Sequence, residues 1–184
     1  MKTIMVKDLM VPLSSYATCS EDASLYEAVM ALEEAQKVFD QTRYKHRAIL
    51  VYNKKNKIVG KLSQLDVLRA LEPRYKDFGD SSSFSRTGLS PLFIRSMQEH
   101  FHLWEKPLDD ICKKASSIMI KDIMYKPAKG EYVKDESTLD EAIHQLVVGH
   151  HQSLLVTNGK EIVGILRLTD VFKEICQRIK TCAI

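Results

Sequence analysis

Ile58–Leu68 reads Ile-Val-Gly-Lys-Leu-Ser-Gln-Leu-Asp-Val-Leu, and Ile162–Phe172 repeats it as Ile-Val-Gly-Ile-Leu-Arg-Leu-Thr-Asp-Val-Phe. In both copies a short apolar run ends at a polar residue, and an aspartate follows three positions later. The apolar run predicts a strand, while the serine and aspartate of the first copy are typical of a helix start. The recurrence indicates an internal repeat that determines the fold.

Further blocks recur in the same order ahead of this stretch in both copies. They are Lys7–Met10 with Lys121–Met124, Leu25–Val29 with Leu139–Ile143, and Ala48–Val51 with Ser153–Val156. The spacing between partners falls by nine residues after the second pair of blocks. This shift predicts an insertion around Glu34–Tyr44 in the first copy.

Each repeat predicts the order helix, strand, strand, helix, preceded by a short extended segment. Ser24 with Glu27, and Thr138 with Glu141, form the sequence pattern of a capping box, which predicts helix starts at Ser24 and Thr138. The predicted strands are Ala48–Tyr52, Ile58–Leu62, Leu154–Thr157 and Ile162–Leu166, the closing helices Asp66–Leu71 and Asp170–Ile179, and the extended segments Ala17–Ser20 and Tyr132–Lys134. The fold class is therefore α/β, of the α+β type.

The predicted organisation is repeat one at 1–72, a partly helical connection at 73–117, and repeat two at 118–184. A unit of about 60 residues has too small a core to be more than marginally stable alone. We therefore expect the repeats to pack about a pseudo-twofold axis with two clefts at the junction. In the connection, Ser90-Pro91 predicts a helix start. Leu92, Phe93, Met97, Phe101 and Trp104 then recur roughly at helical spacing, which suits a core-packed helix, a dimer contact or a lid.

Composition excludes several classes of function. The 184 residues carry a net charge of only +3, too little to indicate a nucleic-acid binder. No apolar run approaches the roughly 18 residues of a membrane-spanning helix. The four cysteines show no paired spacing, which predicts reduced thiols, a cytoplasmic location and no zinc site. No G-x-S-x-G, P-loop or H-E-x-x-H motif occurs, so we expect no enzyme.

Gly60–Asp66 has the form G-x-h-S/T-x-x-D, where h is apolar. With the repeated Lys-Asp-Leu/Ile-Met openings, it resembles a tandem pair of CBS domains, also called a Bateman module. This resemblance implies a sensor that binds adenosyl ligands between its repeats, with Asp66 and Asp170 accepting from ribose hydroxyls and Ser63 beside ribose and phosphate. Ser63 and Asp66 equally suit a helix cap. Repeat two departs from the pattern, because Arg167 replaces the serine and is followed by Leu168-Thr169-Asp170. Arg167 suits either a phosphate clamp or a solvated side chain at a strand end, and we expect the two clefts to be unequal.

Lys45–Val51 resembles the His-Arg-then-strand arrangement of the gamma subunit of AMP-activated protein kinase. This similarity implies phosphate contacts by His46 and Arg47; repeat two keeps the histidine as His151 but has Gln152 instead of arginine. A solvated charge cluster at a strand end is the alternative. A His150-His151 metal pair lacks a third ligand in the sequence. The candidate ligand-binding residues are Ser63, Asp66, Arg167, Thr169, Asp170, His46, Arg47 and His151, with Ala17, Ile49 and Leu154 as adenine walls or plain core residues.

The functional expectation is a regulatory module without an obligatory cofactor. AMP, ADP, ATP or S-adenosylmethionine would bind as the regulatory ligand, and an unknown protein target would receive the signal. We also expect a homodimer, because each repeat has a small core and Leu92 and Phe93 offer extra apolar surface. The alternative is a protein-interaction or dimerisation scaffold with degenerate nucleotide sites.

Overall fold

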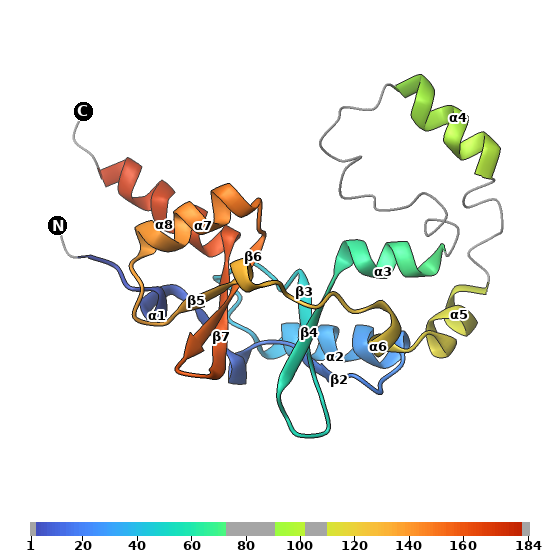
Figure 1. Cartoon of the computed structure of the whole chain (residues 1–184), viewed down its shortest axis with the longest axis horizontal. Coiled ribbons are helices and arrows are strands. Elements are labelled where there is room, and N and C mark those ends of the chain that lie inside the picture. Colours follow the sequence, from blue (N-terminus) through green and yellow to red (C-terminus); the bar gives the residue numbers. More distant parts are fainter. Residues whose placement is uncertain (1–2, 73–90, 102–109, 182–184) are drawn as a thin grey trace.

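The computed structural model describes residues 3–72, 91–101 and 110–181. They form two sheets with helices beside them, as Figure 1 shows. The smaller sheet has the strand order β2-β3-β4, and the larger sheet has the order β1-β7-β6-β5. The chain is therefore of the mixed α/β class that its sequence predicts.

Repeat one builds the smaller sheet. It contains β2 (Thr18–Ser20), α2 (Leu25–Val38), β3 (Ala48–Tyr52), β4 (Ile58–Ser63) and α3 (Gln64–Leu71). Strand β2 runs parallel to β3, and β3 and β4 form an antiparallel hairpin. The Ser24 hydroxyl accepts from Glu27 N at 3.2 Å, while Ser24 N donates to the Glu27 carboxylate at 2.7 Å. The predicted capping box thus starts α2.

Repeat two builds most of the larger sheet in the same way. It contains β5 (Tyr132–Lys134), α7 (Leu139–Gly149), β6 (Ser153–Asn158), β7 (Glu161–Arg167) and α8 (Leu168–Thr181). Strand β5 is parallel to β6, and β6 is antiparallel to β7. The capping box of Thr138 and Glu141 also forms. Both repeats therefore have the predicted order of elements.

The insertion of repeat one has two parts. Helix α2 is longer than its counterpart α7, and residues 39–47 then lead into β3, where repeat two needs only 150–152 before β6. The second part crosses toward repeat two, because Arg43, Tyr44 and Thr42 make hydrogen bonds there.

The remaining elements are α1 (Val6–Leu9), β1 (Val11–Pro12), η1 (Leu13–Ser15), α4 (Pro91–Phe101), α5 (Ile111–Ser117), α6 (Ile120–Ile123) and η5 (Lys129–Glu131). Helix α4 is the helix expected in the connection; Ser90 and Trp104 lie outside the described residues. Leu92 is 81% exposed and Phe93 is 44% exposed, so these two side chains do not support the core-packed interpretation. No helix in the described ranges is long and apolar enough to cross a membrane.

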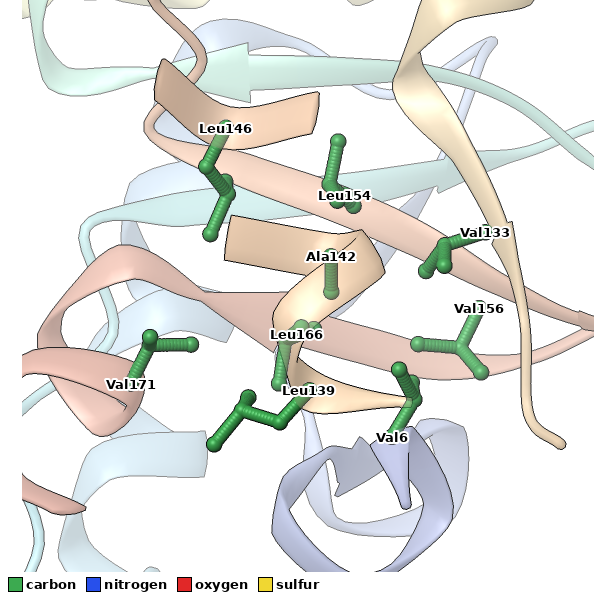
Figure 2. Packing of buried hydrophobic residues seen from close by; sticks show 9 residues of the cluster. All are labelled: Val6, Val133, Leu139, Ala142, Leu146, Leu154, Val156, Leu166 and Val171. Atoms are coloured by element: carbon green, nitrogen blue, oxygen red, sulfur yellow. The ribbon is translucent and has the colours of Figure 1, made fainter. Parts of the chain in front are cut away.

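The two repeats exchange their opening segments. Val6 N donates to Ser137 O at 2.9 Å, and Ile120 N donates to Ala23 O at 2.9 Å, so each opening helix is hydrogen-bonded to the other repeat. Figure 1 shows α1 beside α7 and α6 beside α2. Figure 2 shows Val6 among the apolar side chains of repeat two, and all nine residues of that cluster are buried. Ile120 is buried in the core of repeat one.

The exchange explains the glycine in each Ile-Val-Gly stretch. A methyl group on Gly60 would lie 3.1 Å from Tyr125 O, and one on Gly164 would lie 2.5 Å from Val11 O. The backbone after each Lys-Asp-x-Met opening therefore crosses directly over the glycine of the other repeat. Close backbone approach of this kind leaves no space for a side chain.

A third apolar cluster joins the two sheets at the pseudo-twofold axis. It contains Leu50 from β3, Leu155 from β6, Ile165 from β7 and Val11 from β1, all almost completely buried. Burial of these side chains between the repeats removes apolar surface that each sheet alone would expose to water. The repeats consequently pack as one unit through this shared cluster.

Candidate functional site

A cavity of about 410 Å³ lies at the junction of the repeats. Its walls include the turn from β4 into α3 in repeat one, the segment before β3, the segment before β6 in repeat two, and the chain leading to β5. Because both repeats contribute, the cavity exists only when the two are packed together.

Ser63 and Asp66 lie at one side of this cavity, where β4 ends and α3 begins. The Asp66 Oδ2 atom accepts from Ser63 N at 2.8 Å and from Ser63 Oγ at 2.6 Å, while Ser63 Oγ accepts from Asp66 N at 3.2 Å. The predicted cap is therefore present. The second oxygen, Oδ1, lies 3.9 Å from Arg69 Nη1, which is beyond hydrogen-bond distance. Asp66 can cap the helix with one oxygen and accept from a ligand with the other.

Positive charge lines another part of the cavity. Lys45 and Arg47 are both exposed, and within the described chain no carboxylate lies within ion-pair distance of either. Their position just before β3 brings two cations to the cavity, with no neutralising partner among the described residues. A convergent pair of this kind gives a local field that the small net charge of the chain does not.

His150 and His151 line the cavity from repeat two. His150 adopts φ 52°, in the left-handed region, where α7 ends. His151 N donates to Leu146 O at 2.9 Å and His150 N to Val147 O at 3.3 Å, the bond pattern of a Schellman motif. This helix end turns the chain sharply and directs His151 toward the cavity.

Lys61, Tyr125 and Glu131 form a polar cluster in the same cavity. Lys61 Nζ forms a close ion pair with Glu131 Oε2, and Tyr125 Oη donates to Glu131 Oε1 at 2.5 Å. Burial alone raises the pKa of Glu131, but the hydrogen bonds from Lys61, Tyr125 and Ala128 N outweigh it, so the pKa is lowered. Glu131 accepts a hydrogen bond from the Tyr125 hydroxyl, and this bond raises the pKa of Tyr125 to about 12. Glu131 is thus a charged carboxylate that crosslinks the repeats.

The chemistry of the cavity suits a ligand with hydroxyl groups at one end and an anion at the other. Asp66 Oδ1 can accept from hydroxyls, and a carboxylate makes stronger hydrogen bonds than a neutral acceptor. Arg47, Lys45 and His151 can donate to an anionic group.

Six of the predicted site residues come together here, and five do not. Ser63, Asp66, Arg47, His151, Arg167 and Thr169 line the cavity. Ala17 and Ile49 are buried in the core of repeat one, and Leu154 in that of repeat two. These three occupy the core positions that the sequence left open as the alternative to adenine walls. His46 and Asp170 are also buried and are absent from the described lining.

His46 requires a correction to the expected phosphate contact. Its side chain is 1% exposed, with its ring centroid 4.3 Å from that of Tyr16 and 4.2 Å from that of Phe39. Burial, followed by the nearby Arg167 guanidinium, lowers the pKa of His46 to about 4. The imidazole is neutral at pH 7 and enclosed, so it is placed to pack between aromatic rings. The sequence could not show that residues 39–44 cover it.

Asp170 and Arg167 are paired with each other. Arg167 Nε donates to Asp170 Oδ2 at 2.5 Å and Nη2 donates to Oδ1 at 2.8 Å, and both side chains are buried. Arg43 adds a further ion pair, with Nη2 3.1 Å from Asp170 Oδ2. The expected ribose contact by Asp170 and the expected phosphate contact by Arg167 both conflict with this arrangement, because the two side chains are already hydrogen-bonded to each other.

Sequence reasoning missed Tyr16, Lys61, Tyr125 and Glu131 as lining residues. One signal was available for Glu131, since it occupies in repeat two the position of Ala17 in repeat one, which had been proposed as a wall. For Tyr16, Lys61 and Tyr125 no local pattern in the sequence indicates a place in the cavity. In the described part of the chain no cluster of three or more His, Cys, Asp or Glu side chains suits a metal ion.

Comparison with known proteins places this geometry in context. The chain resembles the crystal structure of the CBS-pair protein CBSX2 from Arabidopsis thaliana, with a TM-score of 0.60, 19% identity, and coverage of 98% of this chain and 100% of that one. A structure of CBSX2 in complex with AMP gives a TM-score of 0.59 at 20% identity, covering 94% and 97%. The CBS domain of a bacterial CNNM/CorC family Mg²⁺ transporter, in complex with ATP, gives a TM-score of 0.58 at 14% identity. The match covers 94% of this chain and 87% of that one.

These similarities, at their low identities, establish the fold. No curated protein sequence matches the chain significantly. The CBS domain family model matches residues 4–73 and 115–177, which is most of the chain, and the matched segments carry the two structural repeats described above. The chain therefore belongs to the CBS domain family and consists of a CBS pair.

Proposed function

We propose that this CBS pair is a regulatory module that binds an adenine nucleotide in the cleft beside Asp66. The observation that carries the proposal is that a capping carboxylate with one available oxygen lines the same cavity as Lys45 and Arg47. The AMP and ATP complexes of two proteins with the same fold support this ligand class. S-adenosylmethionine, which carries the same adenosyl group, is a further candidate ligand and is included in the titrations described below.

In the proposed complex, Asp66 Oδ1 accepts from the ribose hydroxyls, while Arg47, Lys45 and His151 donate to the phosphates. A phosphate loses hydration on entry, so donors that replace water should control its affinity. Arg47 is exposed and lines the cavity, so its guanidinium is accessible to a phosphate.

The proposal is tested by isothermal titration of nucleotide-free protein with AMP, ADP, ATP and S-adenosylmethionine. Asp66→Asn should weaken binding by roughly 10- to 100-fold, because a charge-assisted hydrogen bond is lost. Asp8→Asn is the matched control, since Asp8 also caps a helix through Met5 N but does not line the cavity. Arg47→Ala should weaken ATP binding, whereas Lys54→Ala, on the β3–β4 turn, should not. Absence of heat with all four ligands at millimolar concentration contradicts the proposal.

We propose that the module is non-catalytic and signals to a separate protein, because CBS pairs are typically regulatory modules. A homodimer is proposed from the exposed apolar side chains on the helices, among them Leu65 and Leu68 on α3 and Phe172 on α8. Light scattering at tens of micromolar should show twice the 21.0 kDa chain mass; a species of single-chain mass throughout contradicts the dimer. A dimer that binds none of the ligands would instead favour the scaffold function. Cytoplasmic location remains a prediction for cell fractionation.

A further inference from the structure

The two clefts of the CBS pair are built from equivalent elements but differ in what fills them. In the first cleft the β4–α3 turn carries Asp66, and Lys61 on β4 pairs with Tyr125. In the second cleft Asp170 lies in the first turn of α8, at the equivalent place, and Ile165 on β7 pairs with Val11. The side chain of Asp66 is 19% exposed, whereas that of Asp170 is 3% exposed. Access to the motif aspartate is therefore the main difference between them.

Two arginines take up the Asp170 carboxylate. Arg167 binds both oxygens, at 2.5 and 2.8 Å. Arg43 approaches the same carboxylate through Nε, 3.3 Å from Oδ1, and through Nη2, 3.1 Å from Oδ2. Nη2 of Arg43 also donates to Leu9 O at 3.0 Å, so its side chain is held on both sides. Both oxygens of the Asp170 carboxylate, which would accept hydrogen bonds from ribose hydroxyls, therefore already have donors within the chain.

The rest of the insertion anchors Arg43 in this position. The Phe39 ring lies 4.2 Å from the His46 ring and 5.3 Å below the Arg167 guanidinium, measured to its centroid. Two backbone carbonyls of the same segment accept from repeat two, Tyr44 O from Arg167 at 2.7 Å and Thr42 O from Lys173 at 2.8 Å. Residues 39–44 are thus an ordered bridge over the second cleft.

The space left on this side does not reach the motif aspartate. A cavity of about 330 Å³ is lined by Phe39, Asp40 and Arg43 together with residues near β1, and Asp170 is absent from its described lining. Arg43 lines that cavity and also contacts Asp170, so its side chain lies between the two.

We propose that residues 39–44 are a built-in occupant of the second cleft, with Arg43 taking the place of ligand hydroxyls on Asp170, so that each chain binds one nucleotide, beside Asp66. This inference rests on the proposed function. A nucleotide entering the second cleft must displace contacts made within the chain, which act at a high effective concentration. The first cleft has no such competitor among the described residues.

The test is the number of nucleotides bound per chain, measured with AMP and with ATP by isothermal titration and native mass spectrometry. One nucleotide per chain, bound roughly 10- to 100-fold more weakly by Asp66→Asn, is the expected result. Two per chain overturns the occupied second cleft and leaves the proposed function standing. No bound nucleotide overturns both. One nucleotide that persists in Asp66→Asn at unchanged affinity places the ligand elsewhere and also overturns the inference.

A second set of variants opens the closed cleft. Arg43→Met/Arg167→Ser removes both cations from Asp170 and restores the hydroxyl that repeat one has at the motif position, so the count should rise from one to two at millimolar nucleotide. Arg95→Met, which removes an exposed ion pair on α4, is the control and should leave the count at one. A folded double variant, checked by circular dichroism, that still binds only one nucleotide contradicts the role of these arginines. If the double variant does not fold, the wild-type count and Asp66→Asn decide the matter.

Discussion

Lowering the pH from 7 to 5 should destabilise this protein through His46. Its pKa falls from 6.5 in the unfolded chain to about 4 in the folded protein, because burial and the Arg167 guanidinium disfavour the imidazolium. Between these two values the unfolded chain binds more protons, so the free energy of unfolding decreases as the pH falls. At pH 5 this loss amounts to about 2 kcal/mol relative to neutral pH. The lowered pKa of Glu131 keeps that carboxylate charged throughout this range.

Urea unfolding at pH 7 and pH 5, followed by circular dichroism, measures the effect. His46→Gln is the comparison, since glutamine is polar and does not titrate. The wild type should lose about 2 kcal/mol more than the variant over this pH range, with equal m-values for both. Equal losses in the two proteins would refute the reasoning, because they would mean that His46 is accessible enough to protonate in the folded state.

Three further predictions concern stability. Gly164→Ala should lower the free energy of unfolding by about 1–3 kcal/mol, because the added carbon meets the backbone of β1 at 2.5 Å. Gly130→Ala, whose added carbon meets its nearest atom at 3.8 Å, should destabilise the protein less, and thermal melts compare the two variants. Arg167→Met should cost about 3 kcal/mol by leaving a buried carboxylate with one cation fewer, measured by urea unfolding, and a change below 1 kcal/mol would contradict the ion pair. Val6→Ala should cost about 2 kcal/mol by opening the core of repeat two, while Val38→Ala, 83% exposed, should be neutral; equal melting temperatures would contradict the exchange.

The repeat units were predictable because their signals are local. A capping box needs only a serine or threonine and an acid three positions later, and both predicted boxes, at Ser24 and Thr138, start helices. Alternation of apolar and turn residues located the hairpins, since strand pairing across a short turn follows from the sequence itself. The cap at Ser63 and Asp66 was likewise expected, and it places an available carboxylate oxygen in the cavity.

The two repeats, the order of their elements and the pairing of Ser63 with Asp66 all follow from local signals in the sequence. Three outcomes appear only in the packed fold: the openings exchange between repeats, Glu131 lines the cavity, and Arg43 covers Asp170. These outcomes depend on contacts between residues far apart in the chain, where charge, burial and backbone approach act together and leave no periodic signal in the sequence. His46 shows the same limit, because its neighbours, which lower its pKa to about 4, meet it only in the packed fold.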